Sequence, residues 1–246
     1  MRISLITAVY NNSQGLISSL NSSFQQSYSQ VERIIIDGAS KDGTLSVLEQ
    51  KASELDKVIS EPDNGIYDAL NKGIKLVNGD IVGILHSDDL FSEPTILEKV
   101  VEQFEKTSID LLYGDLCYVR SDNPEKILRY WKSGSFVRTR LKQGWMPPHP
   151  TVYVRREIYE RFGGYDTRYS IAADYDWMLR LLKDPSIKVC YLPEVMVYMG
   201  TGGISNRKLW QKSAEDYKII RKNQIGGIST LILKNLIKIP QFINSK

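Results

Sequence analysis

Asp88 and Asp89 follow a short apolar segment, residues 81–85, and this pair of carboxylates has the clearest chemical potential in the chain. Such a segment is typical of a strand buried on both faces of a parallel sheet, and α/β sheets bind ligands just beyond their strand ends. Adjacent carboxylates repel each other, and a divalent cation that carries phosphates would compensate their charge. The alternative is a solvated loop in which Asp88 caps the next helix, and it would be favoured if the pair stood alone.

Three other segments rich in acids or turn residues follow predicted strands, at residues 10–12, 37–38 and 63–65. The carboxyl ends of parallel strands share one edge of a sheet, so we expect these segments to converge with the acid pair on one crevice. No glycine-rich dinucleotide fingerprint follows the first predicted strand, and the sequence contains no Walker phosphate loop. These absences argue against dinucleotide and ATP chemistry.

A second acidic cluster contains Asp174 and Asp176. A helix that starts near Asp174 places this residue on the same face as Trp177 and Leu181, so we predict that Asp174 points into the pocket, near a helix N-terminus that favours negative charge. The simpler alternative for Asp174 is a plain acidic residue in a first helical turn. Asp176 is predicted to pair with Arg180 four residues later, which is a common surface arrangement.

The elements that would position these acids alternate between strands and helices. This alternation predicts an α/β fold with a Rossmann-like, mostly parallel sheet flanked by helices. We expect strands at residues 3–9, 31–36, 58–60, 81–85 and 109–119, and helices at residues 13–26, 44–55, 66–76 and 94–106. Beyond a proline-rich loop at 121–150 we expect strands at 151–154 and 189–192, helices at 156–162 and 174–182, and a helical tail from 209.

Composition supports one large soluble α/β domain: 246 residues, 42% hydrophobic and 25% charged. A net charge of +3 is too small to indicate a nucleic-acid partner. Cys117 and Cys190 lack metal-ligand spacing and are expected to be reduced thiols. With no signal-peptide pattern and no apolar run long enough to span a bilayer, the expected location is the cytoplasm.

Several segments, in order along the chain, resemble the family 2 glycosyltransferases with the GT-A fold. They are residues 3–11 (ISLITAVYN), 35–44 (IIDGASKDGT), 63–73 (DNGIYDALNKG), 87–89 (SDD), 149–151 (HPT) and 171–176 (IAADYD). The third, fifth and sixth narrow the resemblance to bacterial enzymes that build O-antigen, capsule or exopolysaccharide units.

The resemblance covers about residues 1–205. It implies a nucleotide-sugar-binding half at 1–120 and an acceptor and catalytic half at 121–205. A helical tail rich in basic and apolar residues occupies 206–246.

The resemblance also implies roles for individual residues. Thr7, Val9 and Asp37 would hold the base and ribose of a nucleotide-sugar, and Asp63 would line the same pocket. His149 has two open interpretations: a structural loop histidine stacked on Trp145, or a substrate contact at the acceptor mouth or near the metal.

In the same comparison, Asp89 and Asp88 would bind a divalent metal, Mn²⁺ or Mg²⁺, that bridges the diphosphate, and Asp88 would also contact ribose or sugar. Asp174 matches the family's catalytic base. The acid that precedes it in the family is replaced by Ala173, so Asp176 is kept as an alternative base.

Two segments outside this core have alternative interpretations. Residues 201–205 suit either a lid over the donor or a simple connector. The tail suits an amphipathic helix on anionic lipid, or a helix packed on the domain or on a second copy. Lipid contact is favoured, because the resembled enzymes act on lipid-linked acceptors.

The predicted function is a metal-dependent, inverting glycosyltransferase of hexosyltransferase type. It would move a sugar from a nucleotide-sugar, of UDP type, to a saccharide or lipid-linked acceptor in bacterial surface polysaccharide synthesis, in the cytoplasm or at the inner face of the plasma membrane. The rival hypotheses are a nucleotidyltransferase and a non-catalytic nucleotide-sugar-binding module. The sequence does not specify the donor sugar, the acceptor, the linkage, the metal or the oligomeric state.

Overall fold

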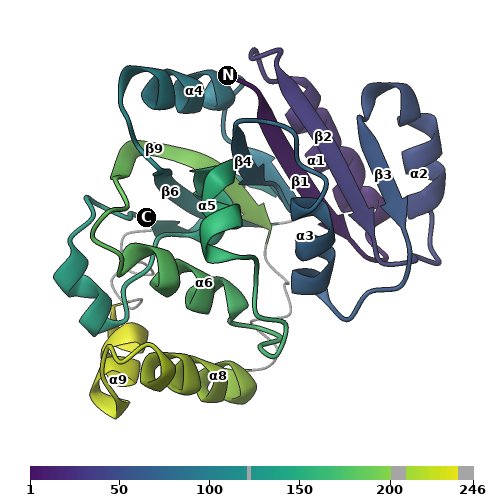
Figure 1. The fold of residues 1–246 in the computed structure, drawn as a ribbon. Coiled ribbons are helices and arrows are strands. Elements are labelled where there is room, and N and C mark those ends of the chain that lie inside the picture. Colours follow the sequence, from purple (N-terminus) through teal and green to yellow (C-terminus); the bar gives the residue numbers. More distant parts are fainter. Residues whose placement is uncertain (121–122, 201–208, 238–246) are drawn as a thin grey trace.

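The computed structural model describes residues 1–120, 123–200 and 209–237. A mixed sheet lies at its centre, with strand order β3-β2-β1-β4-β8-β6-β9-β5 and with β7 paired to β6 (Figure 1). The strands are β1 (Ile3–Val9), β2 (Val31–Asp37), β3 (Lys57–Ser60), β4 (Ile81–Ile84), β5 (Asp89–Phe91), β6 (Leu111–Arg120), β7 (Asn123–Trp131), β8 (Tyr153–Arg155) and β9 (Val189–Gly200).

The half of the sheet that carries the N-terminus is parallel, as predicted. β1 pairs in parallel with β2 and β4, and β2 pairs in parallel with β3. All of β1 is buried, because helices cover both of its faces. The other half is mixed: β8 runs antiparallel between β4 and β6, whereas β6 and β9 are parallel.

The helices form layers on the two faces of the sheet. They are α1 (Ser13–Phe24), α2 (Thr44–Gln50), α3 (Ile66–Ile74), α4 (Ile96–Lys106), α5 (Arg156–Phe162), α6 (Ala173–Leu182), α8 (Leu209–Lys222) and α9 (Ile228–Leu236), with short 3₁₀ turns at η1 (Ala52–Glu54), η2 (Arg138–Gln143) and η3 (His149–Thr151). Alternate residues of β1 feed the two layers: Ile3 and Leu5 share a core with α4, and Ile6 and Ala8 share one with α3 and α6. Figure 1 shows α4 and α6 on opposite sides of the sheet.

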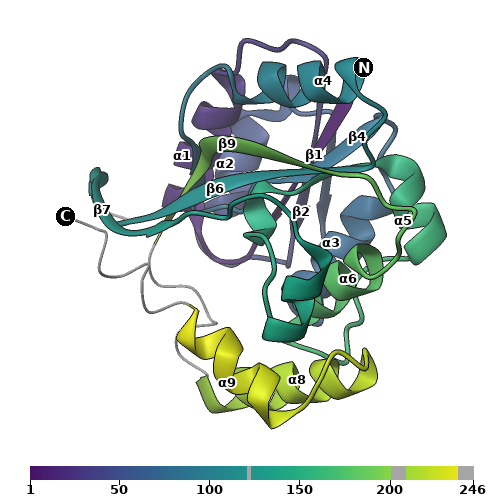
Figure 2. The ribbon, with the colours of Figure 1, turned by 90° about the vertical axis from the view of Figure 1, so that its left-hand side faces the viewer.

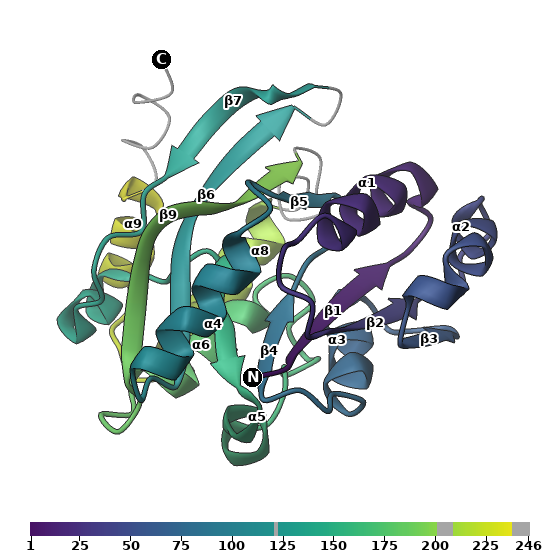
Figure 3. The ribbon, with the colours of Figure 1, turned by 90° about the horizontal axis from the view of Figure 1, so that it is seen from above.

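Two predictions for the second half of the chain were wrong. The predicted loop at 121–150 contains β7, which pairs with β6 in a hairpin that projects from the body (Figure 3). Most of β7 is exposed, so its sequence lacks the alternation that reveals a half-buried strand. β9 continues well past the predicted end at 192. Pro193, the first residue past that end, lies where the pairing with β6 is irregular, and a bulge accommodates proline.

The predicted helical tail is confirmed as α8 and α9, which form a further layer against α6 (Figure 2). None of the helices in the described part of the chain is both long and apolar enough to cross a bilayer. Cys117 is buried, Cys190 is half-buried, and both are free thiols. The segment considered as a lid, residues 201–205, lies outside the described residues.

Candidate active site

The carboxyl ends of β1, β2 and β4 are tied together by the turn that follows β1. Asn12 Nδ2 donates a hydrogen bond to Ser87 Oγ at 3.1 Å, and the backbone amide of Asn11 donates to Ser40 Oγ at 2.8 Å. Asn11 (φ 48°) and Ala39 (φ 60°) adopt left-handed backbone conformations, which cost free energy in residues other than glycine and cluster at functional sites. The predicted convergence of the strand ends is therefore confirmed.

Asp37 and Asp63 lie on neighbouring turns of this edge. Asp37 is fully buried and accepts a 2.6 Å hydrogen bond from Ser60 Oγ. Gly38 allows the turns to approach, because a Cβ atom there would lie 2.5 Å from Asp63 Oδ2 and 3.2 Å from the ring of Tyr10. Tyr10 is 63% exposed and so presents an open aromatic face beside Asp63. The sequence analysis did not single out this ring.

Thr7 and Val9 lie in β1 beneath these turns. Their side chains are only 3% and 4% exposed, and that of Val9 packs in an apolar cluster with Leu16 and Leu20 of α1. The carbonyl oxygen of Val9 accepts a 3.0 Å hydrogen bond from Gly38 N–H. A ligand on this edge would therefore meet the backbone of Val9 rather than its side chain.

The two adjacent acids have opposite environments. Asp88 is exposed, whereas Asp89 begins β5 and is 0% exposed. Burial, and then the neighbouring charge of Asp88, raise the pKa of Asp89 well above its usual value. Both carboxylate oxygens of Asp89 lack a hydrogen-bond partner among the described residues. Burial therefore favours the neutral form of Asp89, and a cation beside it would favour the carboxylate.

The protein offers few ligands for a metal at this edge. Within residues 1–120, 123–200 and 209–237, no cluster of three or more His, Cys, Asp or Glu side chains could hold a metal ion. Asp88 and Asp89 are thus the candidate ligands from the chain. Metal ions in phosphate-transfer sites often take only one or two protein carboxylates and fill the remaining positions with phosphate oxygens and water, so the acid pair fits such a site.

His149 is part of a buried aromatic cluster. Its Nε2 lies 2.7 Å from Tyr165 Oη, and its ring centroid lies 5.9 Å from that of His86. The predicted alternative of stacking on Trp145 is wrong, because the ring of Trp145 packs against those of Tyr113 and Phe136. Burial lowers the pKa of His149 to about 4, so this imidazole is neutral at pH 7.

Asp174 lies in the first turn of α6, half-buried, as the spacing of Trp177 predicted. Its Oδ1 is 3.0 Å from Tyr67 Oη of α3 and accepts a 2.8 Å hydrogen bond from the amide of Tyr175. No described residue donates to its other oxygen, Oδ2. The carboxylate is thus oriented by two groups, while one oxygen stays available for a proton.

His86 connects the two acidic segments. Burial lowers the pKa of its imidazole, and the negative charges of Asp88 and Asp174 act in the opposite direction. Its Nδ1 is buried without a hydrogen-bond partner in the described part of the chain. Its ring centroid lies 5.9 Å from that of His149, which contacts Tyr165, and the ring of Tyr165 lies 5.5 Å from that of Tyr67, the partner of Asp174. This chain of contacts links the end of the parallel half-sheet to the start of α6. The sequence analysis missed His86, although it immediately precedes Ser87-Asp88.

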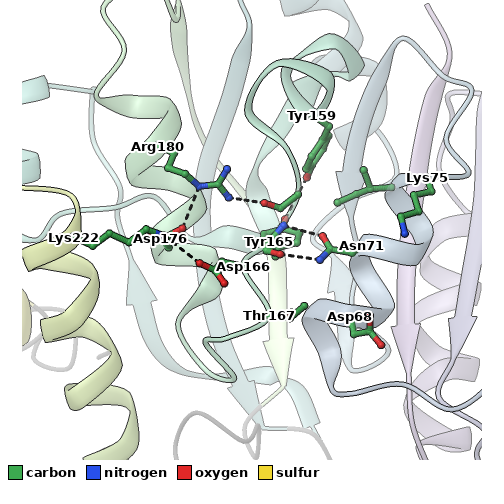
Figure 4. Close-up of a pocket in the computed structure, with 12 residues that line it drawn as sticks. Asp68, Asn71, Lys75, Tyr159, Tyr165, Asp166, Thr167, Asp176, Arg180 and Lys222 are labelled. Atoms are coloured by element: carbon green, nitrogen blue, oxygen red, sulfur yellow. Dashed lines mark hydrogen bonds and ion pairs between the residues drawn. The ribbon is translucent and has the colours of Figure 1, made fainter.

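The predicted pair of Asp176 and Arg180 is present, but its predicted surface location is wrong. Asp176 is 0% exposed and lies 3.1 Å from Arg180 Nε and 3.0 Å from Lys222 Nζ of α8. These residues line a pocket of about 710 Å³, with Asp166 on the same ion-pair network (Figure 4). Asp176 is committed to ion pairs between α6 and α8, which leaves Asp174 as the better candidate base.

Comparisons with known proteins identify the family. Residues 4–165 match the family "Glycosyl transferase family 2". A PGL/p-HBAD biosynthesis glycosyltransferase of Mycobacterium bovis is 30% identical over 208 residues, which are 82% of this chain and 78% of that protein. An uncharacterised glycosyltransferase of Mycobacterium tuberculosis is 32% identical over 203 residues, 78% of this chain and 74% of that protein.

Solved structures share the fold at low sequence identity. The mannosyltransferase PcManGT of Pyrobaculum calidifontis, in complex with GDP-Man and Mn²⁺, has a TM-score of 0.71 at 20% identity, over 99% of this chain and 73% of that one. The structure of S. aureus TarS residues 1–349 has a TM-score of 0.70 at 19% identity, over 100% of this chain and 71% of that one. This chain spans 39% of the longer TarS structure. The α/β architecture is thus that of the GT-A glycosyltransferases, and the chain belongs to glycosyl transferase family 2.

Proposed function

We propose that this glycosyltransferase moves a sugar from a nucleotide-sugar, of UDP-sugar type, to a hydroxyl of a saccharide or lipid-linked saccharide, with inversion at the anomeric carbon. The observation that carries the proposal is the chain of contacts that joins the segment of Asp88 and Asp89 to Asp174. It runs through the side chains of His86, His149, Tyr165 and Tyr67. Structures of TarS with UDP-GlcNAc and of PcManGT with GDP-Man support the donor class. The relative named for PGL/p-HBAD biosynthesis supports an acceptor that belongs to a cell-surface glycan or glycolipid.

The donor nucleotide would lie on the turns after β1, β2 and β3. The exposed ring of Tyr10 offers a face for a base to stack on, and Asp63 beside it can accept hydrogen bonds from base N–H or ribose hydroxyl groups. Asp37 holds its own turn, since its carboxylate accepts bonds from Ser60 Oγ and from the amide of Ser40. In this arrangement Asp37 shapes the pocket that Asp63 and Tyr10 line.

Asp88 and Asp89 would hold a divalent cation, Mn²⁺ or Mg²⁺. Asp88 is exposed and can reach a metal directly, while the unpartnered oxygens of Asp89 would gain a positive neighbour. When bound, the cation would neutralise the charge that develops on the departing diphosphate. The PcManGT complex, which contains Mn²⁺ together with GDP-Man, supports such a metal.

Asp174 would act as the general base through Oδ2. It takes the proton of the acceptor hydroxyl while that oxygen forms a bond to the anomeric carbon. The bond from this carbon to the diphosphate oxygen breaks, and its electron pair leaves with the nucleoside diphosphate. Attack from the face opposite the leaving group inverts the configuration. His149 would form part of the acceptor-side wall, where it contacts His86.

The first experiment is a thermal-shift panel of nucleotide-sugars with and without Mn²⁺, because a ligand that binds only the native state raises its stability. The stabilising donor is then used in a transfer assay on glycan and glycolipid acceptors. Asp174→Asn should keep the thermal shift and lose about 10²- to 10⁴-fold in kcat. Glu160→Gln, at an exposed position on α5, is the control and should match wild type.

Three outcomes would overturn the proposal. Transfer by Asp174→Asn at the wild-type rate would remove the assigned base. Release of pyrophosphate from a nucleoside triphosphate would instead indicate a nucleotidyltransferase. Donor binding without transfer to any acceptor would indicate a binding module.

We also propose that the outer faces of α8 and α9 contact an anionic lipid surface. Trp210 is 91% exposed, and on α9 Ile228 and Ile232 are 65% and 53% exposed. The two acids of the described tail, Glu215 and Asp216, are buried and paired, so the exposed charge of these helices is positive. A basic apolar face is attracted to anionic lipid, and two copies of it would repel each other.

Vesicle sedimentation tests this contact. Binding should occur to vesicles containing phosphatidylglycerol, weaken with salt and be absent from pure phosphatidylcholine. The double variant Trp210→Ser/Ile232→Ser should lose binding. Ile127→Ser/Val137→Ser removes two apolar residues that are exposed elsewhere on the protein, by 44% and 47%, and should keep binding. Equal binding by both double variants, or a stable dimer in place of vesicle binding, would contradict the proposal.

A further inference from the structure

The first turn of α6 lacks a cap of its own. Its N-cap position is Ala172, which has no side chain that could accept a hydrogen bond from the free N–H groups of the turn. The turn nevertheless carries Asp174, whose carboxylate must be held to within a fraction of an ångström if it is to take a proton from a bound acceptor. Some other group must therefore fix this segment.

Glu215 of α8 supplies that group. Its carboxylate accepts hydrogen bonds from the backbone amides of Ser170 at 3.1 Å, Ile171 at 2.9 Å and Ala172 at 3.0 Å. The Oγ of Ser170 donates to the same carboxylate at 3.0 Å. A residue some forty positions later in the chain thus binds three consecutive amides immediately before the turn that carries Asp174.

The charge state of Glu215 suits this role. Burial opposes its ionisation, but the three backbone N–H groups outweigh burial and lower the pKa of Glu215 overall. The carboxylate is therefore charged at pH 7, and it lies at the positive end of α6, where a negative charge is favourable.

The opposite side of the same segment is held by α3. Tyr67 Oη lies 2.8 Å from the carbonyl oxygen of Ile171 and 3.0 Å from Asp174 Oδ1. The segment 170–174 therefore lies between Tyr67 on one side and Glu215 on the other. Each of these side chains is anchored in a different helix, so the position of Asp174 depends on both helices at once.

We propose that Glu215 is a positioning residue for the catalytic base, and that α8 completes the active site from beyond the segment that matches the family, residues 4–165. This inference rests on the proposed role of Asp174. It predicts a specific kinetic signature, because Glu215 contacts the base-bearing segment and none of the residues proposed to bind the donor. Its loss lowers kcat and leaves donor binding unchanged.

The test compares Glu215→Ala, Glu215→Gln and Asn223→Ala by steady-state kinetics with the donor found by thermal shift. Glu215→Ala should lower kcat about 10- to 100-fold with the KM for donor within about twofold of wild type. Glu215→Gln should recover part of kcat, because one amide oxygen can still accept from Ile171 and Ala172.

Asn223→Ala is the matched control. Asn223 is also buried in the α8 region, but it donates to Asp176 Oδ1 at 3.1 Å and does not contact residues 170–172. It should lower the melting temperature and leave kcat within about twofold. Wild-type kcat in Glu215→Ala, or an equal loss of kcat in Asn223→Ala, would overturn the positioning role. A wild-type protein that transfers no sugar would instead refute the proposed function, so the two failures are distinguishable.

Discussion

Lys234 is the most deeply buried cation that the structure describes in the tail, and its removal gives a sharp stability prediction. Its side chain is 5% exposed, and its Nζ lies 2.6 Å from Oδ1 of Asp216, which is 3% exposed. The same ammonium lies 3.1 Å from the ring centroid of Tyr175 in the first turn of α6. Lys234→Met keeps most of the apolar stem but leaves the carboxylate of Asp216 buried without its cation.

The expected cost follows from that unpaired charge. Removing one partner of a buried ion pair destabilises a protein by about 3–5 kcal/mol, because the remaining charge has lost its compensation. The double variant Lys234→Met/Asp216→Leu should recover to within about 1 kcal/mol of wild type, since a buried pair can often be replaced by apolar residues at little cost. The double variant should therefore be about 2–4 kcal/mol more stable than Lys234→Met alone.

Urea unfolding at pH 7, followed by tryptophan fluorescence and circular dichroism, measures these free energies. Lys106→Met is the control, because Lys106 pairs with Glu102 on α4 with both side chains about half exposed. Exposed pairs of this kind contribute little, so this variant should unfold at the wild-type midpoint. If Lys234→Met cost less than about 1 kcal/mol, or if the double variant were no more stable than the single one, the buried pair would not have the strength argued here.

Three further predictions concern titratable groups. Asp88→Asn should abolish the Mn²⁺-dependent part of donor binding, which isothermal titration measures. Asp89→Asn should not lower the melting temperature of the metal-free protein in thermal shift, because burial disfavours the Asp89 carboxylate and its oxygens have no hydrogen-bond partner among the described residues; the opposite pattern would reverse the two assignments. The pKa of His149 is about 4 in the folded protein and 6.5 in the unfolded chain, so between these pH values only the unfolded chain binds a proton at this residue. The free energy of unfolding should therefore fall by up to about 3 kcal/mol as the pH drops from 6.5 to 4. Urea titrations of His149→Gln should show a flatter pH dependence. Glu32 is 1% exposed, and the hydrogen bonds that it accepts from Ser4 Oγ and the amide of Asn78 outweigh burial and bring its pKa to about 2. Glu32→Gln should therefore lower the free energy of unfolding by about 2–3 kcal/mol at pH 7. This loss should shrink as the pH falls from about 4.5 towards 2.

The parallel half of the sheet was predictable because the sequence patterns that specify its strands are local. Residues 81–84 form a continuous apolar run that only a strand covered on both faces would bury, and the acids that follow lie at its carboxyl end. β7 was not predictable, since it is stabilised by pairing with β6 rather than by burying one of its faces. The full length of β9 was not predictable either, because the strand continues past Pro193 through a bulge that can be recognised only from its pairing with β6.

The candidate site was likewise predictable only where its sequence signals are local. The sequence indicated which acids follow strands, and helical spacing placed Asp174 facing inward. It did not distinguish Asp88 from Asp89, because their different exposure arises from the pairing of β5 with β9, more than a hundred residues later. It also predicted a surface position for Asp176. The second partner of Asp176, Lys222, lies on α8, and no local sequence pattern predicts that contact.

In each of these cases the missing information is a contact between residues far apart in the sequence, and such contacts also decide how the proposed site is assembled. The proposed donor side consists of the ends of β1, β2 and β4, which come together when the parallel half of the sheet forms. The position of Asp174, by contrast, is determined by Tyr67 from α3 and Glu215 from α8, two side chains that are 148 positions apart in the sequence and that only the folded chain brings to one turn. The proposed donor-binding half is therefore fixed by the sheet itself, while the position of the proposed base depends on how the tail packs. If donor binding depends on the sheet and the base depends on the tail, the protein should bind its donor before α8 and α9 have packed. It should transfer sugar only after α8 has packed on α6.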